Sequence, residues 1–356
     1  EKRSNLKSWT IILSLSTFIL SMSGTFLVRS GILNSVHTFA NDPERGIFVL
    51  IFLTVLILIS LIIYFKYNDI EKLTKSFLLS KESAIVINNW FMMYFLAVVL
   101  IGTIYPIFLE AITKEKISVG PPYFNQLIIP FLIPFLFIMA LGPKLDWIKN
   151  KKLDAKFTKI ILLILSILIS YLIAKNFNTQ VLYSTLLISA ALYLFFISIT
   201  DLKNEKLKLS QKISHTAFSI LIISIILNSL LSEEVSVNLK KGEEKQLSNY
   251  LLKFENISKM EIDNFTSLIA EIHVIQNDNK LKFYPELRLY KVPETITSEA
   301  DIKTSLFSDN LVVVNYMKDT NYLNIRYQKK PFMLFIWLSA IMLAVGGLIG
   351  LKKNFK

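Results

Sequence analysis

Eight long apolar stretches constrain the fold of this chain more than any other feature of its sequence. Each is long enough to cross the hydrocarbon core of a bilayer as a helix, which takes roughly 20 residues. Apolar residues make up 53% of the chain. We therefore predict a polytopic α-helical membrane protein. Its transmembrane helices are expected at 8–28, 47–65, 90–109, 127–145, 158–174, 181–199, 214–231 and 332–351.

The distribution of basic residues predicts how these helices are oriented, because cytoplasmic connections are enriched in Lys and Arg. The two termini and the connections on their side of the membrane hold 20 basic residues, whereas the opposite short loops hold five. We expect both termini to be cytoplasmic, in a bacterial inner membrane or its mitochondrial equivalent. This asymmetry explains most of the net charge of +12, which gives no reason to expect nucleic acid as a partner.

The basic start EKRSNLK could be taken for the beginning of a signal peptide. The apolar stretch that follows is longer than a signal peptide needs, and no small-residue cleavage pattern occurs at TFLVRSG. Residue 1 is not methionine. We expect a retained first helix, in a chain that is the C-terminal part of something longer.

Between the seventh and eighth helices the sequence changes to charged residues and alternating patterns. Several segments are rich in Val, Ile and Tyr, and NDNK at 277–280 is typical of a hairpin turn. We predict a small all-β periplasmic domain, either a sandwich or a partly closed barrel. The strand-like segments are 268–275, 282–290, 311–317 and 322–327.

These patterns divide the chain into three expected parts. Residues 1–231 form a seven-helix membrane region with an outward loop at 24–46. Residues 232–330 form the β domain, whose length of about 100 residues is enough for one modest core. Residues 331–356 form the last helix and a basic cytoplasmic tail.

The sequence contains no cysteine. A domain outside the cytoplasm is therefore not stapled by disulfides, and neither a CxxC redox motif nor a CxxCH haem-attachment motif is present. The sequence also shows no phosphate-binding glycine loop, no HExxH motif and no plausible paired-carboxylate site, so nothing indicates an ATPase or a membrane protease. Any thiol chemistry would have to use cysteines of a partner.

His37 is one of only three histidines and lies in the expected outward loop, GTFLVRSGILNSVHTFANDPERG. There an imidazole can ligate a metal or haem iron from the water side. Arg29 and Arg45 are near enough in sequence to contact anionic groups such as haem propionates, which guanidinium groups bind well. The alternative is an ordinary loop histidine between interfacial arginines, with Asp42 and Pro43 capping the next helix.

His215 opens the expected seventh helix in QKISHTAFSILIISI. An ionisable residue inside a membrane helix indicates a functional role, and a neutral imidazole that ligates haem iron is one way to satisfy it. The alternative is a helix-end histidine among lipid headgroups. His273, in AEIHVI, alternates with apolar residues and is expected on a solvated strand face.

The segment SVGPPYFN at 118–125 combines turn-forming residues with two aromatic residues beside the expected fourth helix. Tyr123 and Asn125 could line a binding cleft for a planar ligand such as haem. The alternative is an ordinary aromatic belt at the membrane interface.

Ordered motifs along the whole chain carry a resemblance to a known family. The chain is similar to the C-terminal half of the CcmF family of cytochrome c biogenesis proteins, which are membrane haem lyase subunits. The motifs are FLVRSGILNSVHTFANDPERG (26–46), LLSKESAIVINNW (78–90), GTIYPIFLE (102–110), ISVGPPYFN (117–125), FYPELRLYKVPETITSEADI (283–302) and KPFMLFIWLSAIMLAVGGLIGL (330–351).

The resemblance implies an enzyme that attaches haem to the two cysteines of CxxCH in apocytochrome c. It implies that His37, as the catalytic residue, is an axial ligand to substrate haem that a membrane-anchored haem chaperone delivers. It implies that His215 holds a resident haem b, which keeps the incoming iron reduced. Other implied partners are a thiol-reducing or apocytochrome-binding subunit of the lyase, and membrane lipid.

The chain also departs from this family. The tryptophan-rich motif and the histidines that would pair with His37 and His215 belong to the family's N-terminal half and are not in this sequence. Either the sequence is a piece of a longer protein or the protein is split, and the resemblance implies that the N-terminal half or partner subunits complete each iron site and are needed for activity. Two other functions stay open: a transporter for haem or another small amphiphile, and a noncatalytic scaffold that docks partners through the β domain.

Overall fold

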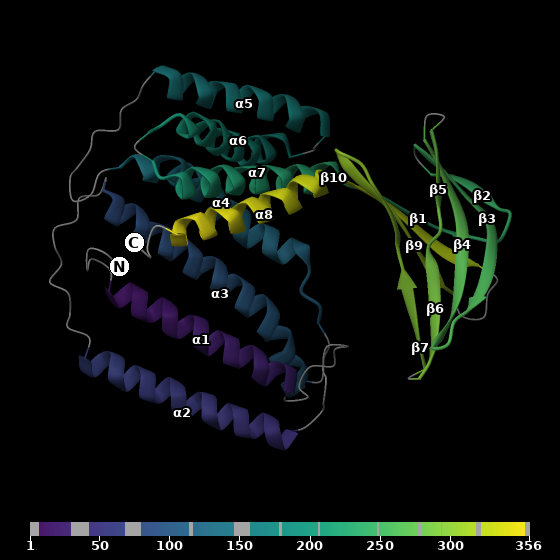
Figure 1. Cartoon of the computed structure of the whole chain (residues 1–356), viewed down its shortest axis with the longest axis horizontal. Helices are drawn as coiled ribbons and strands as arrows, with labels where there is room; N and C mark the ends of the chain where they lie inside the picture. The colour runs from purple at the N-terminus through teal and green to yellow at the C-terminus, as the bar shows by residue number, and fades with distance from the viewer. Residues whose placement is uncertain are drawn as a thin grey trace. The chain divides into compact units, whose positions relative to one another are not determined.

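The computed structural model describes residues 7–29, 43–67, 80–113, 117–145, 157–177, 180–205, 207–247, 249–276, 279–292, 294–317 and 322–352. The chain forms two compact units, Glu1–Ala155 and Lys156–Lys356. The first unit is helical, and the second contains both helices and the β domain (Figure 1).

The first unit consists of two packed helix pairs. The helix α1 packs on α2, and α3 packs on α4 and on the short 3-10 helix η1 that follows α4. The elements are α1 (Lys7–Arg29), α2 (Pro43–Tyr67), α3 (Lys81–Thr113), α4 (Pro121–Leu141) and η1 (Gly142–Lys144).

The second unit places four helices in contact in the order α5, α6, α7 and α8, although α8 follows α7 only after the whole β domain (Figure 1). All eight long helices of the described ranges are long and apolar enough to cross a membrane, which confirms the predicted polytopic class. The helices of this unit are α5 (Phe157–Phe177), α6 (Val181–Leu202), α7 (Leu209–Leu231) and α8 (Met333–Lys352).

The helices α3 and α4 begin six residues or more before the predicted spans, because local capping extends them into polar sequence. Before α3, the Ser83 backbone N–H donates to Ser80 Oγ at 3.3 Å, a side-chain cap for the helix start. Before α4, Gly120 is the N-cap and two prolines follow it, where a missing N–H costs nothing. The segment SVGPPYFN is therefore partly the first turn of α4, and not only a loop.

The β domain is a sandwich of two antiparallel sheets (Figure 1). One sheet has the order β1-β10-β9-β8, and the other has the order β2-β3-β4-β6-β7 with β5 also paired to β4. The strands are β1 (Glu233–Leu239), β2 (Glu244–Leu247), β3 (Tyr250–Glu261), β4 (Phe265–Gln276), β5 (Asn279–Phe283), β6 (Glu286–Lys291), β7 (Glu294–Glu299), β8 (Asp301–Thr304), β9 (Ser308–Tyr316) and β10 (Leu323–Pro331).

Alternating residues of the two sheets form one apolar core. Leu252, Ile272 and Ile325 are fully buried within it, beside the rings of Tyr250 and Tyr327, whose centroids lie 4.9 Å apart. Each tyrosine retains a hydrogen bond for its hydroxyl, to Glu233 Oε2 at 2.6 Å and Asn310 Oδ1 at 2.8 Å respectively. Burial therefore leaves neither phenol oxygen without a partner.

The predicted strands are present, with one correction. The segment 282–290 is not one strand, because Tyr284 and Pro285 separate β5 from β6. Proline lacks an amide hydrogen for the ladder, and here its carbonyl accepts a hydrogen bond from the Ala270 N–H at 3.0 Å. The hairpin between β4 and β5 is confirmed by the pairing of Gln276 with Asn279.

Two short junctions join the sandwich to helices α7 and α8. Only Ser232 separates α7 from β1, and only Phe332 separates β10 from α8. Phe332 has a left-handed backbone with φ of 61°, which is uncommon for a residue other than glycine. Asn228 Nδ2 on α7 donates to the carbonyl of Pro331 at 2.6 Å, so the two junctions are bonded to one another.

Candidate functional site

His215 lies on α7, six residues after its first residue Leu209, whereas the predicted span began at Ser214. The side chain is half-buried, between Ser214 and the buried Thr216. Asp201 on α6 is close enough to interact electrostatically with the imidazole. None of the residues that the structure describes forms a hydrogen bond with the ring.

The helix that carries His215 is packed closely against α8. A Cβ atom on Gly346 would lie 2.4 Å from Ser214 Oγ and 3.2 Å from the Ser214 backbone nitrogen. One helical turn further on, a Cβ on Gly350 would lie 3.6 Å from Ser210 Cβ. Small residues on both helices thus allow a close approach next to His215, as in other membrane helix pairs.

Sequence reasoning did not identify Gly346 or Ser214 as important for the site. The signal was present, because Gly346 and Gly350 are four residues apart within an apolar helix. That spacing is typical of packed membrane helices but does not reveal which helix is the partner.

The structure does not test the roles predicted for His37, Arg29 and Arg45 in and beside the outward loop. His37 lies outside the described residues. Arg29 is the last residue of α1 and Arg45 belongs to the first turn of α2, but the side chains of both lie outside the described part of the chain. Their proposed roles as a haem ligand and as propionate contacts stay predictions.

Tyr123 and Asn125 both lie at the start of α4, but they differ in what they contact. Tyr123 Oη donates to the carbonyl of Val98 on α3 at 3.4 Å, and its ring lies where a Cβ on Gly102 would be, with Cε1 at 2.8 Å. Asn125 is exposed. Residues two apart on a helix do not share a face, so the structure does not bring this pair together toward one ligand.

His273 corrects a prediction, because it is buried and not solvated. Its side chain points away from the core as the alternation predicts, but it is only 4% exposed. Nε2 lies 2.9 Å from Glu271 Oε1, and Nδ1 lies 3.1 Å from Glu255 Oε1 without hydrogen-bond geometry. The strand β4 is central in its sheet, so long side chains of its neighbours cover the ring.

Lys253 completes this charged group on the outer face of the sandwich. It lies opposite His273 in the register of β3 and β4, and its Nζ is 2.8 Å from Glu255 Oε1. The hydrogen bond from Lys253 lowers the pKa of Glu255, and the same bond raises the pKa of Lys253. Both side chains are about one-third exposed, so the group is a structural network at the surface of the sandwich that also shields His273.

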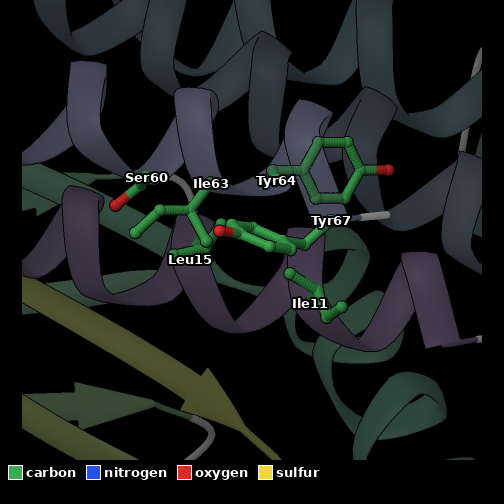
Figure 2. A pocket seen from close by; sticks show the side chains of 6 residues that line it. All are labelled: Ile11, Leu15, Ser60, Ile63, Tyr64 and Tyr67. Carbon is green, nitrogen blue, oxygen red and sulfur yellow. The ribbon is translucent and has the colours of Figure 1, made fainter. Parts of the chain in front are cut away.

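The first unit contains a small apolar cavity of about 220 Å³ between α1 and α2. Figure 2 shows Ile11 and Leu15 of α1 facing Ser60, Ile63, Tyr64 and Tyr67 of α2 around it. Pockets for small molecules are usually about 300–1,000 Å³. None of the predicted site residues lines this cavity, and it is not the haem site that the sequence predicts.

The described residues fit one axial bond to a haem iron. The side chain of His215 supplies an imidazole that is only half-buried on a membrane helix. Neutral imidazole is a common axial ligand of haem iron. In the ranges that the structure describes, no group of three His, Cys, Asp or Glu side chains could hold a bare metal ion.

Comparisons with known proteins agree with the motifs along the chain. Residues 230–331 match the family described as the CcmF C-terminal beta-sandwich. The cytochrome c-type biogenesis protein CcmF of Pseudomonas fluorescens is 32% identical over 98% of this chain and 55% of its own length. CcmF of Pseudomonas aeruginosa is 31% identical over 100% of the chain and 57% of its own length.

A solved structure extends the similarity to the fold. The structure described as "Cytochrome c Heme Lyase CcmF" superposes with a TM-score of 0.74 at 15% identity, over 98% of this chain and 55% of that one. The chain spans about half the length of the relatives it matches. These findings confirm the predicted resemblance: from its first helix to its last, this chain is similar to the C-terminal part of the cytochrome c-type biogenesis protein CcmF.

Proposed function

We propose that this chain acts in cytochrome c biogenesis as the C-terminal part of a membrane haem lyase. Its similarity to CcmF proteins along practically the whole chain supports this role. The observation that carries the proposal is His215, an imidazole on a membrane-spanning helix without a hydrogen-bond partner among the described residues.

The reaction joins two groups that the protein must bring together. A cysteine thiol of apocytochrome c adds across a vinyl group of haem. A carbon–sulfur bond forms, the thiol proton passes to the other vinyl carbon, and no net oxidation occurs. The chain has no cysteine of its own, which fits a reaction whose thiols come from the substrate. The enzyme gains rate by holding vinyl and thiol in one orientation.

His215 would hold a resident haem b through iron, and such a haem supplies an electron that keeps the iron of the incoming haem reduced. Because α7 packs against α6 and α8, the imidazole is held on a braced helix. Any other residue that would hold this haem would come from the N-terminal half of the family or from another subunit, since His273 is enclosed by carboxylates in the sandwich.

His37 would hold the substrate haem from the periplasmic side. Arg29 and Arg45 would bind its propionates, because guanidinium groups pair well with carboxylates. Tyr123 and Asn125 would both contact a planar ligand only after α4 repacked, because Tyr123 is hydrogen-bonded to Val98 on α3.

The proposed setting follows from the charge distribution. Both termini would lie in the cytoplasm of a bacterium, or in the equivalent compartment of an organelle, and the sandwich in the periplasm. Partners would be a haem chaperone, apocytochrome c, an apocytochrome-binding subunit and the N-terminal half. The three-part division at 231 and 330 stays a proposal beside the two compact units described above.

The absorption spectrum of the full complex purified from membranes tests the role of His215. His215→Ala is expected to remove the b-type haem spectrum, because the iron loses its axial nitrogen. His215→Met keeps a ligand and is expected to raise the reduction potential. The matched control is His273→Ala, which removes the other described imidazole and should leave the spectrum intact. An unchanged spectrum in His215→Ala would exclude the assignment.

The role of His37 is tested by cytochrome c maturation in cells. His37→Ala is expected to abolish covalent haem attachment while the resident haem b stays bound. Normal maturation in this variant would rule out His37 as the catalytic ligand. A third outcome would indicate a noncatalytic scaffold. In that case cells with either histidine variant would still mature cytochrome c, and only deletion of the β domain would abolish maturation.

A further inference from the structure

The turn between β8 and β9 exposes two large apolar side chains beside the start of a membrane helix. Leu306 is 59% exposed and Phe307 is 62% exposed. We call Ser305, Leu306, Phe307 and Ser308 the β8–β9 tip. We propose that this tip inserts into the lipid bilayer interface and anchors the sandwich to the membrane surface.

The tip is fixed to the first residues of α8. The Phe332 N–H donates to the Phe307 carbonyl at 2.8 Å. Phe332 in turn directly precedes α8, and its carbonyl accepts hydrogen bonds from the N–H groups of Phe335 and Ile336 in the first turn of that helix. The backbone of the tip is therefore level with the residue that precedes the membrane span.

An aromatic contact places the tip at the depth of the span itself. The rings of Phe307 and Phe335 are stacked, with centroids 6.3 Å apart and an interplanar angle of 28°. The candidate span begins at Met333, so Phe335 lies about 3 Å inside it along the helix axis. We therefore expect lipid around side chains at this depth wherever protein does not cover them.

The tip is also closed by its own hydrogen bonds. The Ser305 N–H donates to the Ser308 carbonyl at 2.9 Å, and Ser305 Oγ donates to the same carbonyl at 2.6 Å. The Ser308 N–H donates to Ser305 Oγ at 3.1 Å. Polar backbone groups that are already bonded cost less to place near hydrocarbon, so the turn presents mainly its apolar side chains to lipid.

Neighbouring side chains are those of a membrane interface. Lys329 and Lys330 lie near the end of β10, four and three residues before the span that begins at Met333, and pair in register with Asn310 and Asp309. Trp337 is 63% exposed about one helical turn into α8. Basic and aromatic residues are typical of the headgroup region. This combination of residues favours lipid, and not a protein partner, as the surface that the β8–β9 tip contacts.

The test uses the absence of native cysteine. Leu306→Cys and Phe307→Cys are each labelled with a polarity-sensitive fluorophore, and the full chain with its co-purifying partners is placed in phosphatidylethanolamine and phosphatidylglycerol nanodiscs. The matched control is Tyr316→Cys, which is 55% exposed at the opposite end of β9. The two ends of this strand are about 27 Å apart.

Labels at 306 and 307 are expected to shift their emission to shorter wavelength and to lose intensity when the lipids carry a nitroxide near the headgroup. The label at 316 should respond to aqueous iodide and not to nitroxide lipid. The proposal fails if the tip labels behave like the control. It also fails if they are shielded only when a partner protein is present.

Because Leu306→Cys leaves the Phe307–Phe335 contact in place, it tests insertion without disturbing the junction. Neither result depends on haem binding, so the proposed function is tested separately.

Discussion

The contact between Gly346 and Ser214 allows a sharp test of how α8 holds the helix that carries His215. A methyl group on residue 346 would lie 2.4 Å from Ser214 Oγ and 3.2 Å from the Ser214 nitrogen. Nonbonded carbon atoms rest at roughly 3.5–4.0 Å. In Gly346→Ala the serine hydroxyl must rotate away, and the backbone of α7 must retreat by a few tenths of an ångström.

The magnitude follows from two opposing effects. Overpacking a well-packed contact costs about 1–3 kcal/mol, while alanine is about 1 kcal/mol more favourable than glycine within a helix. The adjacent Gly347→Ala is the matched control, because no described atom lies within 4 Å of its Cβ position. The two variants share the helix-propensity gain, so their difference of about 1–3 kcal/mol isolates the packing cost.

Reversible unfolding of the full chain in lipid bicelles measures this difference. Gly346→Ala should be less stable than Gly347→Ala, and a second change, Ser214→Ala, should recover most of the loss because it removes the clashing oxygen. Equal stability of the two glycine variants would refute the close approach of α7 and α8. A loss that Ser214→Ala does not recover would show that the backbone contact, and not the hydroxyl, sets the cost.

Three further predictions concern the same unit. Ser210→Cys with Gly350→Cys should form a disulfide on oxidation, since the Cβ atoms would lie 3.6 Å apart and disulfides need about 3.5–4.5 Å; protection from maleimide measures it, and equal closure of Ser210→Cys with Gly347→Cys would disprove the register. Burial, with the nearby Glu233, raises the pKa of Tyr327 from 10.0 to about 12. Stability present below pH 10 should therefore be lost by about 3 kcal/mol as the pH rises to 12, because only the unfolded tyrosine ionises there; thermal unfolding against pH measures it, and Tyr327→Phe should make the loss smaller, while Tyr250, whose pKa burial also raises, accounts for the loss that remains. His273→Ala should destabilise the sandwich by about 1–3 kcal/mol, since it leaves Glu255 and Glu271 without the imidazole between them; an unchanged denaturant midpoint would contradict this.

The membrane helices were predictable because hydropathy and length depend on local sequence alone. The ends of the helices were less predictable. The helices α3 and α4 extend beyond their apolar stretches because Ser80 and the Gly120–Pro122 segment start them, and hydropathy counts these residues as polar or turn-forming. Likewise Pro285 divides a segment whose alternation continues across it. Capping and proline effects also depend on local sequence, but a prediction that rests on hydropathy alone gives them no weight.

The candidate site was predictable in its residue types but not in its surroundings. His215 stood out because an imidazole within a membrane helix is rare. The glycine contact beside it depends on α8, which is more than 100 residues away in the chain and meets α7 only after the sandwich has formed. The burial of His273 has a similar cause, since the side chains that cover it belong largely to β3.

The helix α7 connects the proposed haem site with the sandwich as one rigid element. His215 and Leu231 are separated by about 24 Å along an uninterrupted helix, and Leu231 is followed after one residue by β1. At the sandwich end, Asn228 bonds to Pro331; at the other end, Ser214 meets Gly346. Both contacts are made with the β10–α8 segment, so α7 cannot shift along α8 without breaking one of them. Because the β8–β9 tip is bonded to that same segment at Phe332, its depth in the bilayer and the height of the His215 imidazole are set by a single connected framework.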